Sequence, residues 1–178
     1  QSLTAQSQKL GIDLPILKGT LTSNNLHIKH AASKILSYNP KSIGILGLGF
    51  KPNSDDVRES PSVHLIQKLK LSCKNISFYD PDINIKTMLG SNLEYLNRQI
   101  PDISSMNCDD IDDLIQKSSL IVITQSRVKF SEIYPKIPKE KIIVDLVKLK
   151  KDWEFTNGTK SSQTLANTHT IFPSGNRS

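Results

Sequence analysis

The hydrophobic positions of this chain follow two successive patterns. Between residues 20 and 37, apolar side chains recur at the spacing of three and four residues that gathers them on one face of a helix. They are Leu21, Ile28, Ala31, Ala32, Ile35 and Leu36. From residue 42 onward, short apolar runs alternate with helical patterns, which is typical of a parallel α/β sheet. The sequence therefore predicts a long amphipathic helix followed by a parallel sheet with helices on its flanks.

Polar residues interrupt the apolar stripe of the long helix. Asn24 and Asn25 lie three and four residues after Leu21, where core residues would be expected. A helix end that emerges into solvent would explain them, and so would a polar notch that faces a ligand or a partner subunit. The apolar stripe itself favours a homodimer that packs through this helix.

Four short apolar runs are predicted as strands, over residues 43–48, 76–79, 120–123 and 142–147. Between the first two, Ser60 and Pro61 have the order of a helix N-cap followed by proline at the first helical position. Ser91 and Glu94 have the spacing of a capping box, in which each side chain bonds the other residue's free amide. Helices are therefore expected to begin at both places.

Acidic residues crowd the start of one further predicted helix. They are Asp109, Asp110, Asp112 and Asp113, and the helix presents Ile111, Leu114 and Ile115 on its apolar face. Four neighbouring carboxylates can form a metal site. The positive end of the helix dipole explains them better, so we expect no metal here.

The composition changes again near the end of the chain. Residues 151–178 are rich in Ser, Thr, Asn and Gly and show no apolar periodicity, which is typical of a flexible tail. We therefore expect three segments: a helical segment over residues 1–38, an α/β domain over residues 39–150 and this tail.

Charge and cysteine content exclude several classes of protein. The 178 residues carry a net charge of +6, but the basic residues are scattered and aromatic residues make up only 6%. A nucleic-acid interface is therefore disfavoured. Two cysteines are too few for a disulfide framework. The low cysteine content therefore favours a reducing cytoplasm. No apolar run reaches the roughly 18 residues of a membrane span, so we expect no membrane segment.

The most informative segment is the loop that follows the first predicted strand. Ligands bind at the carboxyl ends of strands in open α/β sheets. Gly47 and Gly49 could begin a dinucleotide fingerprint, but Pro52 stands in place of the third glycine and the next helix begins late. A standard NAD fingerprint is therefore disfavoured at this loop.

The same loop carries two basic residues, Lys51 and Arg58. An ammonium group suits a phosphate or a sugar oxygen, and a planar guanidinium suits a pyrophosphate or an amide. Alternatively, Arg58 simply pairs with Asp55, Asp56 or Glu59. The spacing alone leaves both interpretations open.

Other polar residues give weaker signals. Asp80 ends the second predicted strand and could hold a ribose, but a cap of the turn beside Pro81 is the favoured interpretation. The histidines share no spacing with one another or with a cysteine: His27, His30, His64 and His169. Neither a metal site nor a nucleophile with its base emerges from this chain by itself.

Both halves of the loop resemble a motif of the UDP-glucose/GDP-mannose dehydrogenase family, at the start of its C-terminal domain. The matching residues are Gly47-Leu48-Gly49-Phe50-Lys51 and Asp55-Asp56-Val57-Arg58-Glu59-Ser60-Pro61, supported by Tyr79-Asp80-Pro81 and by Ser23-Asn24. The resemblance covers about residues 1–150. It implies a Rossmann-like nucleotide-sugar-binding domain, preceded by a helix from the central dimerisation region.

A second group of residues resembles the GDP-mannose branch of that family. It comprises Asn92-Leu93-Glu94-Tyr95-Leu96, Ile100-Pro101 and Ser104-Ser105. The resemblance implies an enzyme that oxidises GDP-mannose to GDP-mannuronate in two NAD-dependent steps, through a thioester on a cysteine. A UDP-glucose or other UDP-sugar dehydrogenase is the alternative within the family.

The family motif also implies roles for three loop residues. Lys51 and Phe50 would contact the nucleotide sugar, and Arg58 would reach NAD held by an N-terminal domain. The family's cysteine lies just ahead of the Ser2-Leu3-Thr4 stretch, so its role passes to neither Cys73 nor Cys108. We therefore expect this chain to be the C-terminal part of a longer enzyme and to be inactive alone. A nucleotide-binding module without chemistry of its own is the alternative of another class.

Overall fold

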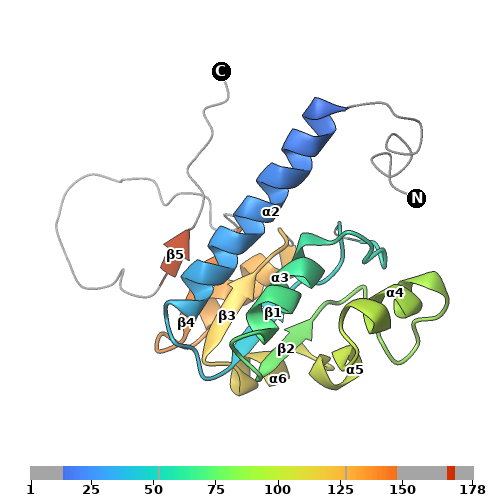
Figure 1. The fold of residues 1–178 in the computed structure, drawn as a ribbon. Coiled ribbons are helices and arrows are strands. Elements are labelled where there is room, and N and C mark those ends of the chain that lie inside the picture. Colours follow the sequence, from blue (N-terminus) through green and yellow to red (C-terminus); the bar gives the residue numbers. More distant parts are fainter. Residues whose placement is uncertain (1–13, 52, 127, 148–167, 171–178) are drawn as a thin grey trace.

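The computed structural model describes residues 14–51, 53–126, 128–147 and 168–170 (Figure 1). Five parallel strands form one sheet in the order β2-β1-β3-β4-β5. Their bounds are β1 (Ile43–Leu46), β2 (Ile76–Tyr79), β3 (Leu120–Ile123), β4 (Ile142–Asp145) and β5 (Thr168–Thr170). The predicted parallel α/β sheet is confirmed.

Helices cover both faces of this sheet. Helices α2 (Pro15–Leu36) and α3 (Pro61–Lys70) lie side by side across one face, and α6 (Ile111–Lys117) packs on the other (Figure 1). Within β1, Ile45 belongs to the core under α2 and α3, whereas Leu46 belongs to the core under α6. β1 and β3 are buried along their whole length because both of their faces are covered.

Helix α6 packs closely against β1 at Gly44. A Cβ added to Gly44 would lie 2.7 Å from Cδ2 of Leu114, closer than packed carbon atoms come. Glycine therefore allows α6 to pack directly against β1.

Helix α2 has a buried end and an exposed end. Its last turns place Ala31, Ala32 and Ile35 in the core, whereas Leu21 is 45% exposed and Asn24 and Asn25 are exposed. Figure 1 shows the amino-terminal turns extending beyond the sheet. The predicted long helix is confirmed, and it begins at Pro15 rather than near residue 20.

The segment between β2 and α6 contains α4 (Ser91–Gln99) and α5 (Ile103–Met106). The helix expected after residue 90 is present, but its predicted capping box is wrong. Gly90, with φ of +69°, turns the chain one residue earlier, a conformation that glycine adopts readily. Ser91 is consequently the first residue inside α4, and its side chain makes no cap bond.

The two other predicted helix starts are confirmed. Oγ of Ser60 accepts a hydrogen bond from the Ser62 amide, with Pro61 at the first helical position of α3. Oδ1 of Asp110 accepts a 2.7 Å bond from the Asp113 amide at the start of α6. Helix α7 (Val128–Ile133) and the 3-10 helix η1 (Tyr134–Lys136) then connect β3 to β4.

Three predicted boundaries differ from the structure. β1 ends before Gly47, whose φ of +103° turns the chain out of the strand. β4 ends at Asp145, because its Oδ1 accepts a bond from the Val147 amide and bends the chain there. The predicted flexible tail contains β5, which pairs with the otherwise open edge of β4. The remainder of residues 151–178 lies outside the described residues.

Candidate functional site

The loop after β1 is fastened to the sheet through its glycine-containing start. The amides of Leu48 and Gly49 donate to Oδ2 of Asp80, at 2.7 and 3.0 Å. The Ser60 hydroxyl donates to the Leu48 carbonyl at 2.7 Å, and the Gln125 amide nitrogen donates to the Gly49 carbonyl. The amide and the carbonyl of both Leu48 and Gly49 are therefore hydrogen-bonded to side chains of the surrounding fold.

Asp80 joins two loops at the carboxyl edge of the sheet. It is 3% exposed, and its second oxygen, Oδ1, accepts a 3.0 Å bond from the Asp82 amide. The favoured interpretation as a cap of the turn beside Pro81 is confirmed. The sequence did not indicate the two bonds to the loop after β1, which run between segments more than thirty residues apart.

A cavity of about 410 Å³ lies beside this loop. Its walls come from α2, the loop, the start of α3 and the chain just after β3 and β4, so it opens at the carboxyl edge of the sheet. The lining residues are Asn24, His27, Ile28, Ala31, Gly49, Phe50, Pro61, Ser62, Leu65, Thr124, Leu146 and Val147. The wall of the cavity is mostly apolar with a few polar groups. It lies where the strand order reverses, between β1 and β3. Both features are usual for a ligand site in this type of sheet.

Phe50 lies at the edge of this cavity, and Lys51 lies next to Phe50. The Phe50 ring lines the cavity and is 49% exposed. Nζ of Lys51 lies 5.8 Å from the centroid of that ring, within the range of a cation–π contact. The Lys51 ammonium therefore lies beside the ring that lines the cavity, although Lys51 itself is not among the lining residues.

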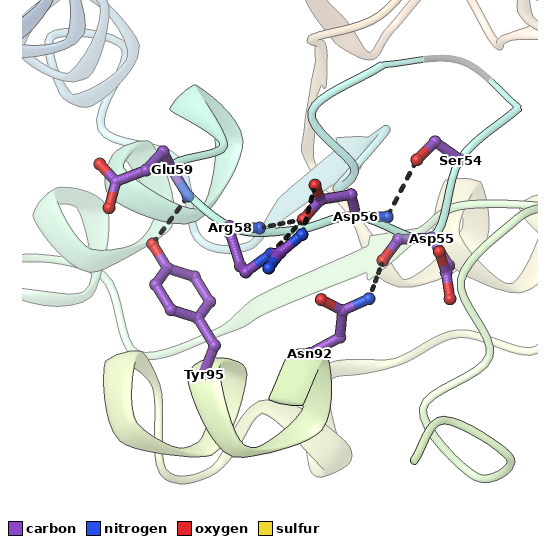
Figure 2. Close-up of polar contacts among 7 residues, drawn as sticks. All are labelled: Ser54, Asp55, Asp56, Arg58, Glu59, Asn92 and Tyr95. Atoms are coloured by element: carbon purple, nitrogen blue, oxygen red, sulfur yellow. Dashed lines mark hydrogen bonds and ion pairs between the residues drawn. The ribbon is translucent and has the colours of Figure 1, made fainter. Parts of the chain in front are cut away.

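Arg58 lies farther along the loop, outside the cavity lining, and pairs with Asp56 (Figure 2). Nε of Arg58 donates to Oδ1 at 2.9 Å and Nη2 donates to Oδ2 at 3.1 Å. The hydrogen bonds from Arg58 lower the pKa of the Asp56 carboxyl, and Asp56 in turn raises the pKa of the guanidinium. Of the partners considered from the sequence, the structure selects Asp56. The side chain of Arg58 is 57% exposed.

Helix α4 contacts the same loop on both sides of this ion pair (Figure 2). Nδ2 of Asn92 donates to the Asp55 carbonyl at 3.1 Å, and the Glu59 amide donates to Oη of Tyr95 at 3.1 Å. Burial raises the pKa of the Tyr95 phenol, which therefore stays protonated at neutral pH. The sequence indicated a helix start here by the Ser91–Glu94 spacing and the Asn92–Leu96 stretch by resemblance, but nothing in that spacing indicates a contact with the loop.

The cysteines and acidic clusters show no metal or nucleophile site. Cys73 and Cys108 are both buried, and burial raises the pKa of the Cys108 thiol. Asp109 pairs with Lys86, and Asp113 pairs with Lys117, each at 2.7 Å. Across the described ranges, no three His, Cys, Asp or Glu side chains are placed to hold a metal. None of the helices described combines the length and apolar composition that crossing a bilayer requires.

Relatives with known functions match most of this chain. GDP-mannose 6-dehydrogenases of Pseudomonas syringae pv. tomato and Pseudomonas aeruginosa are each 31% identical over 147 residues, which cover 83% of this chain and 34% of each relative. UDP-glucose 6-dehydrogenase YwqF of Bacillus subtilis is 36% identical over 73 residues, which cover 39% of this chain and 17% of that enzyme.

Solved structures show the same arrangement. A ternary complex of GDP-mannose dehydrogenase from Pseudomonas aeruginosa matches with a TM-score of 0.69 and 29% identity, over 94% of this chain and 36% of that one. A UDP-glucose dehydrogenase from Pyrobaculum islandicum, at 23% identity, shares the fold with a TM-score of 0.57, over 79% of this chain and 31% of that one.

The family model described as "UDP-glucose/GDP-mannose dehydrogenase family, UDP binding domain" matches residues 44–152. This range contains the loop after β1, the strand end at Asp80 and the helix that contacts the loop. The chain spans about a third of the length of the curated relatives it matches, and it belongs to the UDP-glucose/GDP-mannose dehydrogenase family.

Proposed function

We propose that this chain is the nucleotide-sugar-binding C-terminal part of an NAD-dependent nucleotide-sugar 6-dehydrogenase. The whole enzyme would oxidise GDP-mannose to GDP-mannuronate in two steps. The observation that carries the proposal is the loop from Gly47 to Pro61, which is fastened at the carboxyl edge of the sheet beside a 410 Å³ cavity. The GDP-mannose 6-dehydrogenase relatives support the choice of substrate.

In this proposal, residues 39–150 form the substrate domain, and Lys51 and Phe50 bind the nucleotide sugar. A lysine ammonium is a point charge that suits a diphosphate or a sugar oxygen. The half-exposed Phe50 ring offers an apolar face on which a base or a sugar can pack. Because Lys51 lies next to that ring, one ligand can contact both side chains.

Arg58 would contact NAD that is held mainly by an N-terminal domain. Its guanidinium fits an anionic pyrophosphate or an amide, because the ion pair with Asp56 uses Nε and Nη2 and leaves Nη1 outside the pair. When bound, NAD supplies the hydride acceptor for carbon 6 of the sugar. Closure of two domains around the loop would exclude water and bring the charged groups together.

The covalent chemistry would come from a cysteine outside this chain. Cys73 and Cys108 are buried, and the raised pKa of Cys108 disfavours the thiolate that attacks an aldehyde. Residues 1–38 would belong to the central segment, which would contribute dimer contacts rather than catalytic groups.

The test is NADH formation by the full-length enzyme with GDP-mannose and with UDP-glucose at matched ionic strength. We expect GDP-mannose to be preferred, with two NADH formed per sugar, and no NADH from the 178-residue chain alone. A preference for UDP-glucose would overturn the choice of sugar. NADH from the chain alone would show that the groups needed for hydride transfer lie within it, and would overturn the expected inactivity.

A non-catalytic module would give a different result. The full-length protein would then bind GDP-mannose in a calorimetric titration but form no NADH with either nucleotide sugar. That outcome would overturn the proposal of a dehydrogenase and retain only the binding site.

A further inference from the structure

The segment that carries Arg58 has no regular secondary structure of its own. Between β1 and α3, its shape rests on a few local bonds, among them Phe50 amide to Asp56 carbonyl at 2.8 Å and Ser60 amide to Val57 carbonyl at 3.2 Å. The Val57 side chain is fully buried and anchors the segment to the core. Arg58 itself points away from that core and is mostly exposed. The direction of the guanidinium therefore depends on how the main chain on either side of it is held.

Two side chains of α4 hold that main chain. Asn92 bonds the carbonyl of Asp55 and Tyr95 bonds the amide of Glu59. Asn92 and Tyr95 are three residues apart on α4, so they lie on the same face of the helix. Asp55 and Glu59 are the residues immediately before and after the segment from Asp56 to Arg58. The ion pair thus lies between two fixed points (Figure 2).

The second of these points fixes an unusual backbone conformation. Glu59 has φ of +56°, a left-handed conformation that residues other than glycine adopt at a cost. This turn directs the Glu59 amide toward the Tyr95 hydroxyl and leads the chain into the N-cap of α3. Tyr95 is 8% exposed, so its ring is set in the core and its hydroxyl is a rigid acceptor.

We infer that Asn92 and Tyr95 are positioning residues for Arg58, and that through this arginine they act on the binding of NAD. The inference rests on the proposed function, because it takes the NAD-binding role of Arg58 from there. Neither residue lines the cavity, and in these bonds Asn92 and Tyr95 contact only the main chain of the loop. Their effect should therefore fall on the cofactor and leave the nucleotide sugar largely unaffected.

The experiment uses Tyr95→Phe and Asn92→Ala in the full-length enzyme. Tyr95→Phe keeps the buried ring and removes only the hydroxyl, so that the fold of α4 is preserved. Loss of one such bond should raise KM for NAD about fivefold, which corresponds to roughly 1 kcal/mol at 1.4 kcal/mol per tenfold change. KM for the nucleotide sugar should change less than twofold. Asn97→Ala is the matched control, because Asn97 is an exposed asparagine on the same helix.

A double substitution shows whether the effect passes through Arg58. In an Arg58→Ala enzyme, Tyr95→Phe should cause no further rise in KM for NAD, because coupled residues are not additive. Equal effects of Tyr95→Phe with and without Arg58 would overturn the inference. So would equal rises in KM for both substrates, which would indicate a structural role.

Hydrogen exchange separates this inference from the proposed function. Amides of residues 55–60 should exchange faster in Tyr95→Phe than in the parent enzyme or in Asn97→Ala, whatever the substrate. Unchanged exchange in this segment would overturn the positioning role. Faster exchange together with an Arg58→Ala enzyme of normal KM for NAD would refute the proposed role of Arg58, and with it the inferred effect on the cofactor.

Discussion

Burial gives the charged residues of the loop region two different roles. Asp80 is 3% exposed and its carboxylate accepts three main-chain bonds, so removing it would leave buried amides without a partner. Arg58 and Asp56 are 57% and 41% exposed, and solvent screens such pairs so that they contribute little to stability. Asp80 is therefore a fixed structural group, whereas Arg58 can exchange Asp56 for a ligand at small cost.

The pKa shifts of the exposed pair indicate the pH range in which it persists. Because Arg58 lowers the pKa of Asp56, the stability that the pair contributes is present above the ordinary Asp pKa of 3.8 and is lost only as the pH falls through the lowered value. Both partners are therefore charged throughout the neutral range. A competing anion, rather than a change of pH, is the agent that would release Arg58.

The two basic residues of the loop should separate in their effects on the two substrates. In the full-length enzyme, Lys51→Ala should raise KM for the nucleotide sugar about tenfold and leave KM for NAD nearly unchanged. Arg58→Ala should do the reverse. Under the proposed function each change removes a charge-assisted bond to one ligand, and about tenfold corresponds to the lower end of the roughly 1.5–3 kcal/mol that such a bond contributes. Initial rates with each substrate varied in turn provide the measurement.

Lys74→Ala is the control for this pair. Lys74 is an exposed lysine just before the amino end of β2, whereas the loop follows the carboxyl end of β1. It should change neither KM. Small and equal effects of Lys51→Ala and Arg58→Ala would show that the loop has only a structural role.

At the scale of elements, the start of α3 fastens the loop to the sheet. Oγ of Ser60 accepts from the Ser62 amide and donates to the Leu48 carbonyl at 2.7 Å, and the residue is fully buried. Ser60→Ala should lower the free energy of unfolding by about 1–2 kcal/mol, because it removes an N-cap and leaves a buried carbonyl without this partner. Urea unfolding of the 178-residue chain measures the change.

Ser91→Ala is the matched control at the start of α4. Ser91 is exposed and makes no cap bond, so this change should leave the free energy of unfolding within about 0.5 kcal/mol. A loss as large as that of Ser60→Ala would restore the capping box that the sequence predicted.

Elements were predictable where one local signal decided them. The apolar runs of β1, β2, β3 and β4 are visible because both faces of a parallel sheet are buried. The three-residue strand β5 carries Thr-His-Thr and has no such pattern. Its place in the sheet comes from main-chain pairing with β4, which a pattern of apolar side chains does not reveal. The spacing at Ser91 failed because the left-handed Gly90 moved the helix start by one residue.

The candidate site was predictable only in part for the same reason. The loop, with Lys51 and Arg58, was identified because it follows a strand directly and its residues are contiguous. Its supports, Asp80, Asn92 and Tyr95, lie about thirty or more residues farther along the chain. Contacts over such separations depend on the packing of whole elements, which no local spacing encodes.

At the scale of the whole molecule, α2 divides into a packed and an unpacked half. Ala31 and Ile35 are buried against the sheet layer, whereas Ile16, Leu21 and Leu26 are 85%, 45% and 50% exposed. At five-residue spacing these three side chains point to different sides of the helix, and of them only Leu21 belongs to the apolar stripe. The dimer expected from that stripe would cover Leu21, and it remains a prediction.

Substitution of the exposed leucines of α2 should change assembly and leave the domain intact. In the full-length enzyme, Leu21→Gln with Leu26→Gln should shift sedimentation from dimer toward monomer, because the change removes apolar area from the interface while glutamine preserves helix propensity. The urea midpoint of the 178-residue chain should hardly move, since neither side chain is buried there. Lys29→Gln, at an exposed position of the same helix, should alter neither measurement. A dimer that persists despite both leucine changes would show that Leu21 and Leu26 do not hold the interface, and would overturn the dimer expected from the apolar stripe.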